Sequence, residues 1–83
     1  MKMLRRISNA QPLSLIEEGR TVRIKSISGG RGLKHRLYDM GLYDGVLIKI
    51  LRNDASGPMI LKVLDSRVMI GRGQAHKIQV EEI

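Results

Sequence analysis

The stretch from residue 33 to residue 51 constrains the fold of this chain more than any other part of the sequence. Leu33, Leu37 and Met40 are spaced at i, i+4 and i+7, which places three apolar side chains on one face of a helix. Gly41 follows them, at the point where helices often end in a left-handed residue that glycine adopts without strain. The sequence therefore predicts a short helix from about Leu33 to Met40 that ends at Gly41.

The period of the apolar residues changes directly after this helix. Asp44-Gly45 is a strong turn dipeptide, which makes Gly45 a second structural glycine. From Val46 onward, Val46, Ile48 and Ile50 alternate with other residues, as in a strand with one buried face. This order predicts a helix that forms a corner between two strands.

Further short strands are predicted on both sides of this corner. They show a period of two and are separated by turn residues, a pattern typical of a small barrel or sandwich. In the first of them, Val22 and Ile24, with Ser26, are expected to point inward. The expected strands cover residues 21–27, 46–52, 59–64, 68–70 and 78–80. We therefore expect an all-β fold, namely a five-stranded, partly open SH3-like barrel with a short corner helix after the first long strand.

The remaining segments are predicted to be turns, loops and one extension. Ser14 and Glu17 have the spacing of a capping box, which predicts a single helical turn that stops at Gly19. Residues 29–32 form a glycine-rich loop, and a short turn is expected around residues 74 and 75. Residues 1–10 are expected to be a flexible basic extension, and residues 11–83 one domain.

Composition limits the size and chemistry of this domain. A chain of 83 residues buries only ~60–65% of the surface of its unfolded form. There is no Phe or Trp, so the core must be aliphatic, and we expect the methionines, including Met40, Met59 and Met69, to fill it. The absence of cysteine indicates a reducing, cytoplasmic location. The formal charge of +7 favours an acidic partner.

No arrangement of residues indicates catalysis or a cofactor. The glycine-rich loop lacks the phosphate-binding and dinucleotide patterns. A metal site would need the two histidines, His35 and His76, together with carboxylates, and they lie far apart in the sequence. They are weak metal candidates, and Asp39 and Asp44 could at most form a weak site. We expect a chain that is not an enzyme.

Two tyrosines flank the end of the predicted helix. Tyr38 lies off the apolar stripe, and Tyr43 follows Leu42. A tyrosine brings a large contact area at low entropic cost, so exposed tyrosines beside Leu42 would suit a protein partner. Alternatively, one or both could cap the open end of the barrel.

The same region carries a family resemblance. It resembles the signature of the FeoA family through Arg36, Leu37, Met40, Gly41, Leu42, Gly45 and Ile48. The match extends to both sides, through Pro12, Leu13, Ile16, Gly19, Ile24, Gly29 and Gly30, and through Gly71, Arg72, Gly73, Ala75, Ile78 and Val80. One departure is the loop of residues 54–58, where the family usually has Gly-Asp-Pro.

The resemblance implies a function as well as an SH3-like fold. FeoA proteins are small cytosolic partners of the FeoB ferrous-iron transporter, so the implied role is a non-enzymatic adaptor or regulator of GTP-dependent iron uptake. It would reach the inner face of the membrane through that partner. At family level the resemblance also implies transition-metal binding. The candidate partner-binding residues are Arg36, Tyr38, Asp39, Leu42 and Tyr43.

Two other functions remain open. The basic charge would suit a nucleic-acid-binding small barrel, although two tyrosines offer little stacking surface. The chain could also be the SH3-like module of a metal-dependent repressor acting in trans. Self-association through an exposed edge strand is a further possibility.

Overall fold

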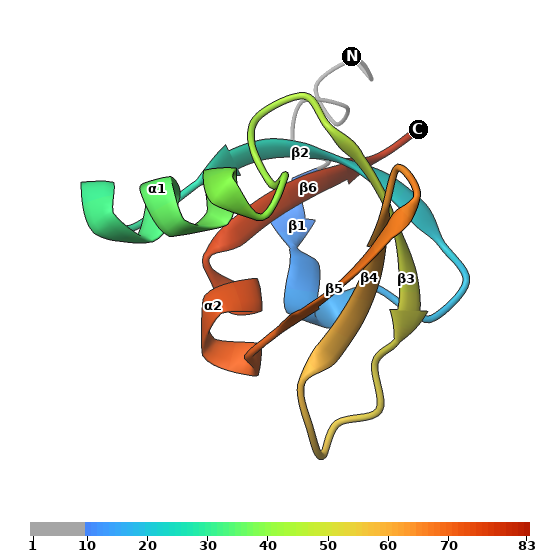
Figure 1. Ribbon diagram of the computed structural model, residues 1–83. Coiled ribbons are helices and arrows are strands. Elements are labelled where there is room, and N and C mark those ends of the chain that lie inside the picture. Colours follow the sequence, from blue (N-terminus) through green and yellow to red (C-terminus); the bar gives the residue numbers. More distant parts are fainter. Residues whose placement is uncertain (1–9) are drawn as a thin grey trace, which may run out of the picture.

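The computed structural model describes residues 10–83 (Figure 1). In chain order its elements are β1 (Gln11–Pro12), the 3-10 turn η2 (Leu13–Leu15), β2 (Thr21–Ile27), α1 (Arg31–Asp39), β3 (Leu47–Arg52), β4 (Met59–Val63), β5 (Ser66–Ile70), α2 (Arg72–His76) and β6 (Ile78–Glu82). The expected extension lies almost entirely outside these residues, and only Ala10, which is exposed, can be described.

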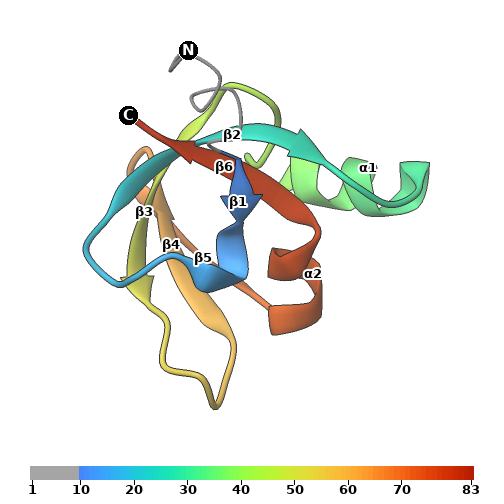
Figure 2. The same cartoon turned by 180° about the vertical axis from the view of Figure 1, so that it is seen from behind.

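Within residues 10–83 the strands form one antiparallel sheet in the order β1-β6-β2-β3-β4-β5. The sheet curls so that β3, β4 and β5 lie across from β6 and β1 (Figures 1 and 2). This small, partly open SH3-like barrel confirms the predicted fold class. The described residues contain six strands where five were expected, because two residues before η2 pair with β6 as β1.

The strands bend at two places where the pairing register shifts. One shift lies between Ile24 and Ser26 in β2, and another between Ile50 and Arg52 in β3. An extra residue in one strand reverses which side chains face inward beyond it. In β2 this change buries Ile27 and exposes Ser26, so the expectation that Ser26 points inward is wrong.

Helix α1 forms the predicted corner between β2 and β3. It begins at Arg31, two residues before the expected start, because Gly30 adopts the extended backbone of a helix cap. Leu37 is fully buried, and Leu33 and Met40 pack partly buried against the core. The expected apolar stripe is therefore confirmed.

Two glycines end this corner as predicted. Gly41 has φ +89° and Gly45 has φ +93°, which are left-handed conformations that side chains with a Cβ rarely adopt. The backbone N–H groups of Gly41 and Leu42 donate to the carbonyl oxygens of Tyr38 and Leu37, both at 2.9 Å. The helix therefore stops and turns directly into the approach to β3.

The N-terminal turn differs from its prediction. Residues 13–15 form one 3-10 turn with no side-chain cap, so the capping box predicted from Ser14 and Glu17 is wrong. Such a short turn ends before Glu17, which instead lies 4.0 Å from Arg20. Ser14 Oγ lies 3.2 Å from Nδ1 of His76, which joins the turn to α2.

The core is aliphatic, as composition predicted. It is filled by residues from strands β2 to β6, from η2 and from both helices. The loops after η2 and after α1 contribute one residue each. The buried set is Leu13, Ile16, Val22, Ile24, Ile27, Leu37, Leu42, Ile48, Ile50, Met59, Leu61, Val63, Ile70, Ala75, Ile78 and Val80. Met59 belongs to it, but Met69 is 62% exposed, because the alternation of β5 places it on the outer face. The expectation that Met69 fills the core is therefore wrong.

Asn53 ties the β3–β4 loop to the N-terminal turn. Its side-chain amide donates to the carbonyl oxygens of Ser14, at 3.2 Å, and Ile16, at 2.7 Å. Its side-chain oxygen accepts a hydrogen bond from Arg72 at 2.6 Å, and its backbone N–H donates to Glu18 at 2.8 Å. One side chain thereby fastens three separate segments together.

The loop that departs from the family pattern closes around Asp54. Its carboxylate accepts hydrogen bonds from the backbone N–H and the hydroxyl of Ser56, at 3.2 and 3.1 Å, and from Arg52 Nε at 3.4 Å. These bonds, the backbone bond from Ser56 above all, hold the pKa of the Asp54 carboxyl below its usual value. A turn closed by hydrogen bonds to the Asp54 side chain therefore shapes this loop.

Candidate functional site

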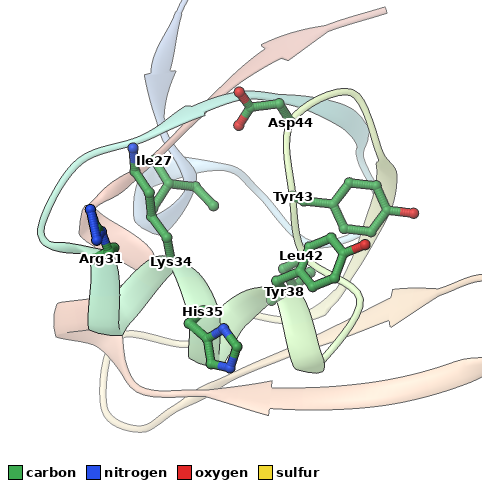
Figure 3. Close-up of a pocket in the computed structure, with 8 residues that line it drawn as sticks. All are labelled: Ile27, Arg31, Lys34, His35, Tyr38, Leu42, Tyr43 and Asp44. Carbon is green, nitrogen blue, oxygen red and sulfur yellow. The ribbon is translucent and has the colours of Figure 1, made fainter.

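A hollow opens between α1, the end of β2 and the loop that leads into β3. Its volume is about 470 Å³. It is lined by Ile27, Arg31, Lys34, His35, Tyr38, Leu42, Tyr43 and Asp44, which Figure 3 shows as sticks. We call this hollow the α1 pocket. It exists because the register shift in β2 turns Ile27 inward beneath α1 and because Gly41 turns the chain back beside the helix.

The two tyrosines form one aromatic surface at a rim of the α1 pocket. Their ring centroids are 5.1 Å apart and the ring planes are tilted by 43°, a favourable geometry for an aromatic pair. Tyr38 is 61% exposed and Tyr43 is 44% exposed. Figure 3 shows both hydroxyl groups directed outward. The rings support each other and still present a face to solvent.

Charged side chains occupy other parts of the same rim. Arg31 and Lys34 come from the first turn of α1, and Asp44 comes from the turn before β3 (Figure 3). Within residues 10–83, none of the three takes part in an ion pair. The pocket therefore combines a hydrophobic floor, an aromatic edge and a mostly basic border.

The predicted partner-binding residues fall into two groups. Tyr38 and Tyr43 line the pocket, whereas Arg36 and Asp39 lie on α1 outside its lining. Leu42 also lines the pocket, but it is fully buried and forms part of the hydrophobic floor. It can meet a partner only from within the pocket, and its role in partner binding stays a prediction. The periodicity could not reveal this, because Leu42 follows the helix and belongs to neither repeating pattern.

Sequence reasoning did not bring Ile27, Arg31, Lys34 and Asp44 together with the tyrosines. From the sequence, Arg31 was assigned to the glycine-rich loop, Lys34 to the predicted helix, and Asp44 to a turn and a weak metal site. A register shift brings Ile27 to this site, and a regular period of two gives no sign of it. The Gly29-Gly30 pair, one residue after the end of β2, was the available sign that the chain changes direction here.

The whole architecture matches one known family. The sequence profile of the FeoA domain matches residues 11–82. A protein of Methanocaldococcus jannaschii, provisionally named Fe(2+) transport protein A, is 42% identical over 71 residues, which cover 86% of this chain and 85% of that protein. The chain belongs to the FeoA domain family. It is therefore a small protein of a family associated with ferrous iron transport.

Solved structures support the same FeoA assignment. The crystal structure of an iron uptake regulatory protein (FeoA) superimposes with a TM-score of 0.85 at 32% identity, over 89% of this chain and 99% of that one. The fold also recurs in a manganese-dependent transcriptional repressor, with a TM-score of 0.81 at 18% identity, where it covers 42% of that chain. The second likeness concerns the fold alone.

The histidines of this FeoA domain do not gather into a metal site. His35 Nε2 lies 3.7 Å from the Asp39 carboxylate on the exposed face of α1, and Figure 3 shows its ring pointing away from the pocket floor. His76 lies at the end of α2 beside Ser14. Residues 10–83 contain no group of three or more histidine, cysteine, aspartate or glutamate side chains placed to hold a metal ion. The two candidate histidines therefore lie at separate places in the fold, one on α1 and one at the end of α2.

The helices of this FeoA domain are short. Among residues 10–83, no helix has the length and apolar character needed to cross a membrane.

Proposed function

We propose that this protein is a non-enzymatic cytoplasmic adaptor that docks on the cytosolic part of a FeoB-type transporter and modulates its GTP-dependent uptake of ferrous iron. Residues 11–83 act as one unit in this role. Family membership supports the connection to iron transport, as does the name of the Methanocaldococcus jannaschii relative. The protein carries no resident cofactor in this proposal.

The exposed pair of Tyr38 and Tyr43 at the α1 pocket is the observation that supports a docking surface there. Binding energy concentrates in a few buried anchors, and tyrosine is enriched among them. Here two tyrosines already pack together at 5.1 Å, so they lose little freedom when a partner covers them. A pre-ordered aromatic edge above a hydrophobic floor suits an apolar side chain from the partner.

The charged side chains at the rim indicate which groups a partner would place next to its apolar side chain. Arg31 and Lys34 favour an acidic group next to that apolar side chain, because opposite charges across an interface steer association and fix orientation. Asp44 disfavours an acidic group on its own side of the rim. We therefore propose that a short segment with an apolar or aromatic residue beside an acidic one occupies the α1 pocket.

The direct test is a titration of the full chain against the purified cytosolic GTPase portion of the cognate transporter. Tyr38→Ala/Tyr43→Ala should weaken binding by about tenfold or more, because the loss of one anchor typically costs at least ~1 kcal/mol. Leu15→Ala is the matched control, since Leu15 is a 67% exposed apolar residue away from the pocket. Unchanged binding by the folded double variant would exclude this surface.

Nucleic-acid binding is the second candidate function, and one observation favours it. Arg31 and Lys34 lie at the same pocket as two exposed aromatic rings, a combination that single-stranded nucleic acids use. The same titration with single-stranded RNA separates the two functions. The adaptor account expects saturable binding to the transporter portion and only weak, strongly salt-dependent binding to RNA.

A further inference from the structure

The outer face of β3, β4 and β5 carries a row of three basic side chains. Lys49 lies directly opposite Lys62, and Lys62 lies directly opposite Arg67, in the registers of the two strand pairs. All three are exposed. Like charges opposite each other on neighbouring strands destabilise a sheet. We call these three residues the basic row.

The charges of the basic row are not neutralised within the described chain. No ion pair in residues 10–83 involves Lys49, Lys62 or Arg67. By contrast, Lys25 on the neighbouring β2 lies 3.9 Å from Glu81. The repulsion between these charges therefore lowers the stability of the sheet slightly, and three positive charges remain on one outer face.

Exposed apolar side chains flank the basic row along the strands. Met69 is 62% exposed on β5, and Leu47 is 44% exposed on β3. Leu64 is 83% exposed in the turn between β4 and β5, and its φ of +56° is uncommon for a residue other than glycine. Because β3 and β4 are antiparallel, Leu47 and Leu64 lie toward the same end of the face. The turn also carries one acidic residue, Asp65.

This face is separate from the α1 pocket. None of its residues lines that pocket. The β4–β5 turn and the outer end of α1 lie on opposite sides of the molecule in both views (Figures 1 and 2).

We propose that the outer face of β3–β5 binds the surface of an anionic lipid bilayer. The basic row would lie against the headgroups, and Leu64 and Leu47 would enter the boundary between headgroups and acyl chains. Clustered Lys and Arg are attracted to anionic lipids, and apolar residues beside them add hydrophobic anchoring. Charge complementarity alone would also suit an acidic protein segment or RNA. Leu64, which is 83% exposed in the turn, favours the bilayer over RNA, because binding through phosphate charge alone makes no use of an apolar side chain. Binding to an acidic peptide without binding to anionic vesicles would overturn the proposal.

The proposal is tested by sedimenting the full chain with lipid vesicles, and it requires no transporter. We expect binding to vesicles of phosphatidylcholine mixed with phosphatidylglycerol, weaker binding at higher salt, and no binding to phosphatidylcholine alone. Lys49→Gln/Lys62→Gln/Arg67→Gln should weaken binding by about tenfold or more, given the attraction of each basic residue to an anionic surface. Leu64→Ser should weaken it several-fold without changing the number of basic residues.

The matched control is Lys2→Gln/Arg5→Gln/Arg6→Gln, which removes the same number of positive charges outside the described residues. This variant should keep most of the vesicle binding. An equal loss by the control would overturn the proposal, because general charge would then suffice. Absence of vesicle binding by the unmodified chain at low salt, with or without binding to RNA, would also overturn it. Thermal melting verifies that each variant is folded.

Discussion

Single residues at the loops decide how the segments of this protein meet. Gly41 turns the chain after α1, Asn53 joins three segments, and Asp54 closes the loop between β3 and β4. Each acts through its backbone conformation or its hydrogen bonds. Their contributions can therefore be tested by substitutions that leave the hydrophobic core intact.

Gly41→Ala is expected to lower the free energy of unfolding by about 1–2 kcal/mol, because a Cβ is disfavoured in a left-handed conformation. An added Cβ would lie 3.5 Å from Val63, an ordinary contact, so backbone strain is the cause. Gly32→Ala inside α1 is the control and should raise stability by about 0.4–1 kcal/mol. Denaturant unfolding measures both. Equal effects of the two substitutions would contradict the assigned role of Gly41.

Asn53→Ala is expected to lower the free energy of unfolding by about 1–3 kcal/mol, because it leaves two backbone carbonyls and Arg72 without their partner. Ser56→Ala in the same loop is the control and should change stability by less than about 0.5 kcal/mol. Chemical denaturation of both variants checks this. If Ser56→Ala lowered the free energy of unfolding as much as Asn53→Ala, the stabilisation would come from the loop in general and not from the hydrogen bonds of Asn53.

Asp54 is expected to make the loop sensitive to acid. Its pKa is lower in the folded protein than in the unfolded chain, so its stabilising contribution is complete above the unfolded pKa. The contribution is lost as the pH falls through the folded pKa. An NMR titration of the carboxyl groups measures this directly, and Ser56→Ala should raise the pKa of Asp54. An unchanged pKa in that variant would mean that the Ser56 hydroxyl does not contribute.

At the scale of elements, regular patterns were predictable and local interruptions were not. The apolar spacing and the two glycines predicted the end of α1 and the start of the next strand to within one residue, and the start of α1 to within two. Strand β1 escaped prediction because two residues show no period, and its pairing with β6 joins opposite ends of the chain. The bulge in β2 escaped because Ser26 continues the period while the structure breaks it.

The candidate site was only partly predictable for the same reason. The tyrosines stand out in the sequence because the chain contains no other aromatic residues except histidine. Their contact with each other and their closeness to Ile27 depend on where α1 crosses the end of β2. That crossing is a property of the assembled elements, and no local pattern in the sequence reports it.

Replacing the central member of the basic row should stabilise the sheet. Lys62→Thr is expected to raise the free energy of unfolding by about 0.2–1 kcal/mol, because it removes two like-charge neighbours and favours the strand. Lys25→Thr is the control, since it removes an ion pair with Glu81 and should not gain from reduced repulsion. Thermal unfolding at low and high salt measures both. A gain from Lys62→Thr that persists unchanged at high salt would argue against repulsion as its cause.

At the scale of the whole molecule, two surfaces are available on different sides of one small barrel. The α1 pocket offers a hydrophobic floor with an aromatic edge, and the outer face of β3–β5 offers the basic row. Such an arrangement would let the protein contact a bilayer and a membrane transporter at the same time. Docking on the transporter is proposed to use the first surface, the α1 pocket.

Docking at the α1 pocket is tested most directly by NMR spectra of the isotope-labelled chain, recorded while the cytosolic GTPase portion of the transporter is added. We predict that the largest changes in amide signals occur in residues 31–45 and around Ile27, which surround the α1 pocket. Those changes should vanish with Tyr38→Ala/Tyr43→Ala. Saturable binding whose largest changes map to the outer face of β3–β5, or to the turn around Asn53, would contradict the account.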